Sequence, residues 1–261
     1  MENAQTVGGL LKAWRERRRK CQLDLALDAE ISTRHLSFVE TGRAKPSREM
    51  ILLLAEQLDI PLRERNKILV VAGYAPCFSE RSLDDSALSA ARQAIELILK
   101  GHEPFPALAV DRHWNLVLAN RTVPLLLDGI EPEILQPPLN VLRLSLHPRG
   151  LAPRIVNLSQ WRNHILSRLK RQADETADTG LEKLLDELKA LSRGGKSEGH
   201  EIDDDGPLVV PLKLESKWGV LSFISTTTIF GTPMDVTVAE LALETFFPAD
   251  DFTKTVFNQF Q

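Results

Sequence analysis

Apolar side chains in the first 74 residues follow the spacing of α-helices. Val7, Leu10, Leu11 and Trp14 share one helical face at i, i+3, i+4 and i+7. Proline, serine and glycine residues separate this stripe from later stripes of the same period. The pattern predicts five short helices: one through Trp14, two over about 22–29 and 32–40, one that starts at Pro46–Ser47, and one that starts at Pro61 and ends near Ala72–Gly73.

Beyond residue 100 the period of the pattern changes. Residues 106–111 and 115–120 are short apolar runs joined by a polar turn, which predicts a β-hairpin, and Asn120 is expected to open the helix that follows. The runs 208–214, 219–231 and 236–247 also predict strands, although the last fits a helical period as well. Pro211 cannot donate a ladder hydrogen bond, so its strand is expected at a sheet edge or a bulge. Two stripes in the middle predict helices, with Leu158, Trp161, Ile165 and Leu169 in one and Leu181, Leu184, Leu185 and Leu188 in the other.

Segments without periodicity divide the chain. Residues 75–85 hold proline, serine and charge, which predicts a domain boundary, and a helix over about 86–100 follows. We therefore expect a multidomain protein: an all-α domain over 1–74, a linker and connecting helix over 75–100, and an α+β domain with an antiparallel sheet over 101–261. Residues 192–207 are polar and glycine-rich, which predicts a mobile loop in the second domain.

Composition bounds the class of protein. The chain is 43% hydrophobic and 26% charged, as globular proteins are, and it has no apolar run of the ~18 residues that span a bilayer. Its start, MENAQTVGGLLKAW, lacks the order of a signal peptide, so no membrane partner and a cytoplasmic location are expected. The two cysteines, Cys21 and Cys77, are far apart in sequence, and a reducing compartment does not favour a disulfide between them.

Charge is distributed unevenly along the chain. The net charge is −4, but residues 1–74 hold 13 Lys and Arg against 10 Asp and Glu, and the rest hold 19 against 26. A basic first domain on an acidic second one suits a polyanion partner for the first domain only.

The predicted helices near 22–29 and 32–40 have the organisation of a helix-turn-helix, whose second helix lies in the DNA major groove. Small polar and basic side chains occupy the first turns of that second helix, as base reading requires. Arg34 is the leading base reader, because arginine can donate two hydrogen bonds to guanine. A helical bundle with merely solvated arginines is the alternative. The residues expected to contact DNA bases or phosphates are Gln22, Ser32, Thr33, Arg34, His35, Ser37, Arg43, Lys45 and Ser47.

A motif covering about 65 residues supports this interpretation. It resembles the five-helix DNA-binding domain of phage repressors and the xenobiotic-response-element family, through Gln22, Ala26, Ser32, Leu36, Ser37, Glu40, Gly42, Pro46 and Ser47. Two positions depart from the family. Glu30 stands where the turn usually has glycine, and a residue other than glycine held at positive φ costs about 1 kcal/mol. Cys21 stands at a helix cap where serine or threonine is usual. Together, the two changes predict a less stable helix-turn-helix.

Longer sequence motifs extend the resemblance over nearly the whole chain. Residues 103–107, 140–148, 157–161, 230–233 and 244–250 look like the MmyB-like regulator family, and Asn66 and residues 72–76 match it as well. The resemblance implies a PAS-like ligand-binding domain after the helix-turn-helix and a role in bacterial transcription regulation.

A sheet covered by helices can leave an apolar cavity with a few polar groups. Val117, Leu221 and Ile224 are candidates for its apolar lining. A fatty-acid-like ligand would need a cationic or hydrogen-bonding anchor near its carboxylate. Each candidate also has a plain structural interpretation, such as a turn cap for His147, a surface pair for Arg154 and core packing for the tryptophans. The candidate ligand-binding residues are Trp114, Asn120, Arg143, His147, Arg154, Asn157, Trp161 and Phe223.

Enzymatic motifs are incomplete in this sequence. Asp111 and His113 offer two possible metal ligands without a third at a suitable spacing. Gly195-Lys-Ser197 resembles the end of a phosphate-binding loop, but the first glycine of that motif would fall at Ala190. We expect no catalytic residue, metal or cofactor.

The sequence thus predicts a transcription regulator that binds a palindromic double-stranded DNA operator as a homodimer, with reading helices about 34 Å apart. A small apolar ligand in the PAS-like domain would control this binding. The alternative is a regulator whose second domain only dimerises the chain or binds other proteins.

Overall fold

The computed structural model describes residues 6–192, 209–231 and 233–260, so the predicted loop over 192–207 lies outside the described residues except for its first position. The chain forms two compact units. The first is Met1–Arg81 together with Asp174–Thr176 and Pro233–Ala239, and the second contains the remaining residues from Ser82 onward.

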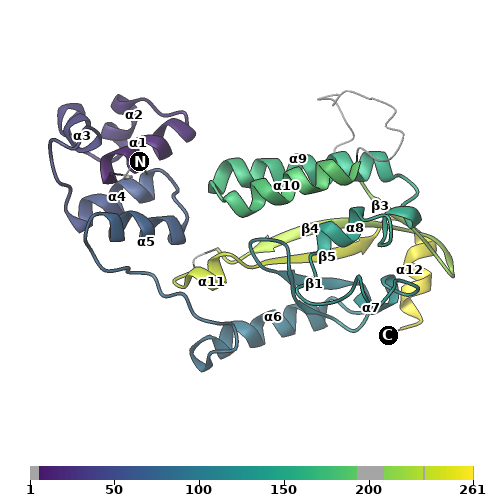
Figure 1. Ribbon diagram of the computed structural model, residues 1–261. Helices are drawn as coiled ribbons and strands as arrows, with labels where there is room; N and C mark the ends of the chain where they lie inside the picture. Colours follow the sequence, from purple (N-terminus) through teal and green to yellow (C-terminus); the bar gives the residue numbers. More distant parts are fainter. Residues whose placement is uncertain (1–5, 193–208, 232, 261) are drawn as a thin grey trace. The chain divides into compact units, whose positions relative to one another are not determined.

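The first unit contains the five predicted helices. The hydroxyls of Ser32 and Ser47 accept hydrogen bonds from the backbone N–H groups of His35 and Met50, and these caps start the third and fourth helices. Gly42 has a φ of 73° just after the third helix, a conformation that glycine adopts without strain. The helices are α1 (Val7–Arg17), α2 (Gln22–Asp28), α3 (Thr33–Glu40), α4 (Arg48–Gln57) and α5 (Leu62–Val71) (Figure 1).

Helices α1 and α3 touch at a glycine. A Cβ atom on Gly8 would lie 2.2 Å from the carbonyl oxygen of Val39 and 2.6 Å from that of Glu40. The absence of a side chain at Gly8 therefore lets α1 pack directly against the C-terminal end of α3. Leu11 on α1 and Leu36 on α3 are both fully buried in this packing.

The two departures from the family motif have distinct structures. The thiol of Cys21 accepts a hydrogen bond from Asp24 N at 3.4 Å, and the Asp24 carboxylate accepts one from Cys21 N, so the cap is formed. Hydrogen bonds to the Asp24 carboxylate from the side chain and then from the backbone N–H of Cys21 lower the pKa of Asp24. Glu30 has a φ of 53°, as expected for the turn position where the family has glycine. The backbone is thus strained at Glu30, whereas Cys21 caps α2 in place of serine.

The second unit is built on an antiparallel sheet of five strands in the order β2-β1-β5-β4-β3. The predicted hairpin is confirmed as β1 and β2, which pair directly. The strand after Pro211 is confirmed at a sheet edge, and the proline lies just outside it. The strands are β1 (Ala107–Val110), β2 (Leu116–Ala119), β3 (Leu212–Ser216), β4 (Gly219–Ile229) and β5 (Ala242–Pro248).

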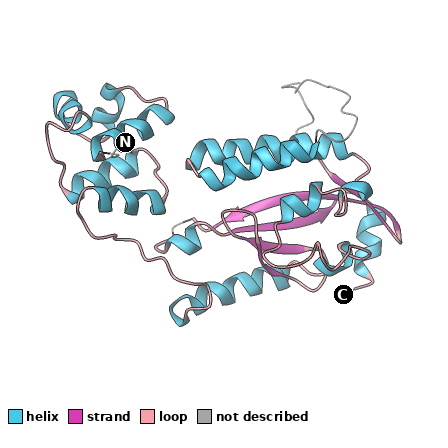
Figure 2. Ribbon diagram, viewed as in Figure 1, coloured by secondary structure: helices cyan, strands magenta, loops and turns pink. Residues whose placement is uncertain are grey.

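Helices cover both faces of this sheet (Figures 1 and 2). Leu99 of α6 packs on Ala107, Ala109 and Leu243 on one face. The larger core lies on the other face, between the sheet and α8, α9 and α10. This arrangement confirms the predicted α+β fold class. The helices of the unit are α6 (Ser89–Gly101), α7 (Val123–Leu126), α8 (Val141–Leu146), α9 (Leu158–Thr176), α10 (Thr179–Ser192) and α12 (Asp251–Asn258), with single 3-10 turns at Ser86–Leu88 and Ala152–Arg154.

Two local predictions are corrected. The run 236–247 is not one strand, because the Asp235 carboxylate accepts a hydrogen bond from Thr237 N and starts the short helix α11 (Val236–Ala239) before β5. Asn120 does not open a helix. Its side chain is buried and bonds Ala107 N, Leu99 O and Phe105 O, and α7 begins only at Val123.

Candidate functional site

The exposed face of α3 joins two arginines through one aromatic ring. Arg34 is exposed, and its guanidinium lies 5.3 Å from the ring centroid of Phe38. Arg43, beyond the end of the helix, lies 5.9 Å from the same ring. Because the stacking leaves their hydrogen-bond donors available, both arginines can still bind bases or phosphates.

The other candidates on and after α3 lie around these arginines. Thr33, His35 and Ser37 are half-buried, and Lys45 is exposed. Ser32 and Ser47 use their oxygens as helix caps. The Ser32 hydroxyl keeps its hydrogen for donation, whereas the Ser47 hydroxyl donates to the Glu49 carboxylate.

A buried network fixes the position of this helix. Arg15 of α1 donates to both carboxylate oxygens of Glu40 at the end of α3, at 2.6 and 3.0 Å. Gln22 at the start of α2 donates its amide N–H to Glu40 Oε2 at 2.8 Å. The Gln22 amide nitrogen, which the sequence placed on a phosphate, is therefore engaged with Glu40. Helices α1, α2 and α3 therefore meet at the Glu40 carboxylate.

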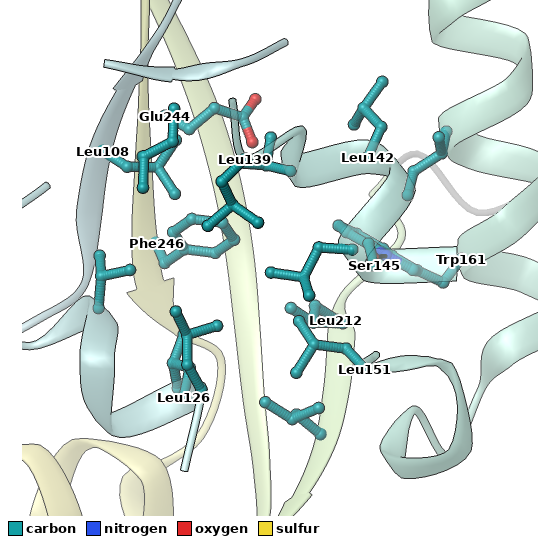
Figure 3. A pocket seen from close by; sticks show the side chains of 17 residues that line it. Leu108, Leu126, Leu139, Leu142, Ser145, Leu151, Trp161, Leu212, Glu244 and Phe246 are labelled. Carbon is teal, nitrogen blue, oxygen red and sulfur yellow. Dashed lines mark hydrogen bonds between the residues drawn. The ribbon is translucent and has the colours of Figure 1, made fainter. Parts of the chain in front are cut away.

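The second unit contains an apolar cavity of about 80 Å3 between the sheet and α7, α8 and α9 (Figure 3). Its lining is almost entirely leucine, valine, isoleucine and aromatic side chains, including Leu108, Leu126 and Phe246. The polar groups that line it are Ser145, Glu244 and the indole of Trp161. Trp161 donates its Nε1–H to Ser145 Oγ at 2.9 Å.

Trp161 is one of the predicted ligand-binding residues and lines this cavity, whereas the others hold the fold together. Arg143 forms an ion pair with Glu187 at 2.5 Å, and this hydrogen bond lowers the pKa of Glu187. His147 Nδ1 accepts from Arg149 N at 3.0 Å, so the predicted turn cap is present. Three of the remaining five bind backbone groups: Asn120 as above, Arg154 by donating to the carbonyls of Leu126, Asp128 and Glu215, and Asn157 by donating to Pro211 O and accepting from Lys213 N. The other two are core residues. Trp114 donates to the Gln172 side chain, and Phe223 packs against Phe246 and Phe257.

A polar cluster stands beside the cavity. Arg168 of α9 binds Glu244 Oε1, and its guanidinium lies 4.4 Å from the Trp114 ring centroid. Thr227 of β4, directly opposite Glu244 in the ladder, donates to the same oxygen at 2.9 Å. Burial, and then the positive charge of Arg168, lower the pKa of the neighbouring His164.

Sequence reasoning missed Phe38, Arg168 and the role of Glu244. Phe38 follows Arg34 by four residues, a spacing that places both on one helical face. Glu244 alternates with Phe246 along β5, which places both on one side of the strand. These two signals were available in the sequence, but the contact with Arg168 depends on the tertiary fold.

Comparison with known protein families matches both units. A helix-turn-helix model matches residues 11–65, and a model described as the MmyB-like transcription regulator ligand binding domain matches residues 91–259. No curated protein matches the chain. Among the described residues, no cluster of three or more His, Cys, Asp or Glu is arranged to hold a metal ion, and no helix has the length and apolarity to cross a membrane.

Proposed function

Since this chain belongs to the MmyB-like transcription regulators, in which a DNA-binding helix-turn-helix is joined to a ligand-binding domain, we propose that it binds a palindromic operator as a homodimer under the control of a small apolar ligand. Arg34 reads a base, while Arg43, Lys45 and Ser47 hold the neighbouring phosphates. Ligand in the cavity changes the fraction of dimers in which the distance between the two α3 helices matches the distance between the operator half-sites.

The observation that carries the DNA-binding part is the pair of arginines on the Phe38 ring, presented on a helix whose other face is buried. A stacked guanidinium has a restricted orientation, so less entropy is lost when it binds guanine. The buried Arg15–Glu40 contact supports the same role, because it holds α3 firmly against α1.

Operator selection followed by binding assays tests this part. The Arg34→Ala variant is expected to lose discrimination at one base pair per half-site, worth about 1–3 kcal/mol, while keeping its affinity for non-specific DNA. The Lys45→Ala variant should weaken binding to all sequences alike and reduce the slope of log K against log salt by about one phosphate contact. Lys189→Ala on α10 is the matched control and should change neither property. Equal loss on every sequence in the Arg34→Ala variant would place Arg34 on a phosphate instead.

The apolar cavity supports the ligand part, since a domain that only dimerises the chain has no need of an apolar cavity in its core. Denaturing mass spectrometry of protein purified from its host should detect a recurrent small molecule. Light scattering with and without operator should report two chains per site. A clean protein that shows no thermal shift with any apolar compound would favour the dimerisation alternative.

A further inference from the structure

Glu244 places a carboxylate in the wall of the apolar cavity. Its side chain is only 8% exposed, and Figure 3 shows the carboxylate at the opposite end of the lining side chains from Leu126. A carboxylate in such surroundings is strongly disfavoured unless hydrogen bonds replace its lost hydration. The partners of its two oxygens therefore decide what else the cavity can hold.

The two oxygens of Glu244 differ in their partners. Oε1 accepts hydrogen bonds from Arg168 Nη2 and from Thr227 Oγ1. Oε2 accepts none from the residues that the structure describes. A carboxylate oxygen has the capacity to accept two hydrogen bonds. Oε2 is thus an open acceptor for a donor in the cavity.

A ligand carboxylate would find no counter-charge here. None of the described residues that line the cavity is lysine, arginine or histidine. The nearby Arg168 already binds Glu244 and Thr227 and lies over the Trp114 ring. A second carboxylate would lose its hydration next to a like charge, and repulsion between like charges is strong where water is excluded. A neutral O–H group avoids both costs.

The size of the cavity limits the ligand. The cavity measures about 80 Å3, which favours a small ligand. The apolar lining disfavours a ligand with several polar groups.

We propose that the cavity selects a small neutral aliphatic alcohol, whose hydroxyl donates a hydrogen bond to Glu244 Oε2, over a carboxylate of the same length. This inference rests on the proposed ligand control and narrows its ligand class. It also replaces the fatty-acid-like ligand that the sequence favoured.

Calorimetric titration of the full chain with three probes tests the inference. The probes are n-hexanol, n-hexanoate and methyl pentyl ether, which has the atoms of hexanol but no donor. Hexanol should bind about tenfold more tightly than either of the other two, as expected for one hydrogen bond to a charged acceptor. Hexanoate binding as tightly as hexanol would overturn the alcohol preference and leave the ligand-control proposal standing. Failure of all three probes to bind would overturn the alcohol inference, while mass spectrometry of the protein purified from its host decides ligand control on its own.

The Glu244→Gln variant tests the role of the acceptor itself. Because Arg168 and Thr227 donate to position Oε1, the amide oxygen is expected to face them and the amide N–H2 to face the cavity. The preference for hexanol over the ether should then fall from about tenfold to near unity. Glu187→Gln, the same substitution in the exposed pair with Arg143, should leave the preference unchanged. An unchanged preference in folded Glu244→Gln would place the hydroxyl elsewhere, and the wild-type comparison remains decisive if this variant does not fold.

Discussion

Arg15 and Glu40 form a buried, two-point ion pair between α1 and α3, with Nε to Oε1 at 2.6 Å and Nη2 to Oε2 at 3.0 Å. The Glu40 side chain is 1% exposed, and Gln22 supplies its third hydrogen bond. Because its donors come from both α1 and α2, this one carboxylate at the end of α3 sets the relative positions of the three helices.

The Arg15→Met variant should therefore lose about 3–5 kcal/mol of unfolding free energy, because it leaves a buried carboxylate without its cation. Urea denaturation of the full chain, with hydrogen exchange of residues 7–40 to locate the change, measures the loss. The double variant Arg15→Met with Glu40→Leu should recover most of it. Lys12→Met removes the exposed Lys12–Glu16 pair at 3.8 Å and should cost less than about 1 kcal/mol. Equal losses in Lys12→Met and Arg15→Met would show that the buried pair has no special role.

Gly8→Ala tests the close approach of α1 and α3. Alanine is the better helix former by about 1 kcal/mol, so propensity alone favours the substitution. The new Cβ would lie 2.2 Å from Val39 O, however, and backbone must move to admit it. A net loss of about 1–3 kcal/mol is expected, together with weaker operator binding, since α3 is displaced.

Gly9→Ala is the matched control for this prediction. It lies one residue away on the same helix, and the nearest atom to its Cβ would be Thr6 Oγ1 at 3.1 Å. The Thr6 side chain, which caps α1, must shift by a few tenths of an ångström, and this cost offsets alanine's better helix propensity, so stability should change little. Thermal unfolding of both variants decides the matter, and a stabilised Gly8→Ala would contradict the close approach.

His164 should make the second unit less stable in acid. Its pKa is lowered in the folded chain by burial and by the charge of Arg168. As pH falls below the ordinary value of 6.5, the unfolded chain therefore binds a proton before the folded one does. Unfolding free energy should fall with pH in this window, by less than about 1.4 kcal/mol per pH unit. Urea denaturation between about pH 7.5 and pH 5.5 should show a weaker pH dependence for His164→Gln than for the wild type. Identical slopes would remove His164 as the cause.

The helices and the hairpin were predictable because apolar spacing and capping residues are local signals. Ser32, Ser47 and Gly42 start or end their helices as the sequence indicates. The run 236–247 fitted both the helical and the strand period. Its first residues form a helix, because the Asp235 carboxylate accepts a hydrogen bond from Thr237 N.

The ligand residues were harder to predict, because chemistry alone does not say which partner a side chain finds. Arg143 and Arg154 have the right groups to hold a carboxylate, but their partners are Glu187 and backbone carbonyls. Glu244 reaches the cavity through the register of β4 and β5, which places Thr227 opposite it, and through the packing of α9, which brings Arg168. Register and packing are long-range properties that a single sequence does not specify.

Glu30 in the turn between α2 and α3 provides a direct test of backbone strain. Its φ of 53° lies in the left-handed region, where a side chain costs about 1 kcal/mol and glycine has no penalty. Its side chain is exposed, so Glu30→Gly should lose little packing and gain about 1 kcal/mol of unfolding free energy. The more firmly held turn should also raise operator affinity. Ala29→Gly, at the preceding residue with a φ of −90°, relieves no strain and should destabilise the chain. Thermal unfolding of the two variants measures this contrast, and a loss of stability in both would show that the turn carries no strain at Glu30.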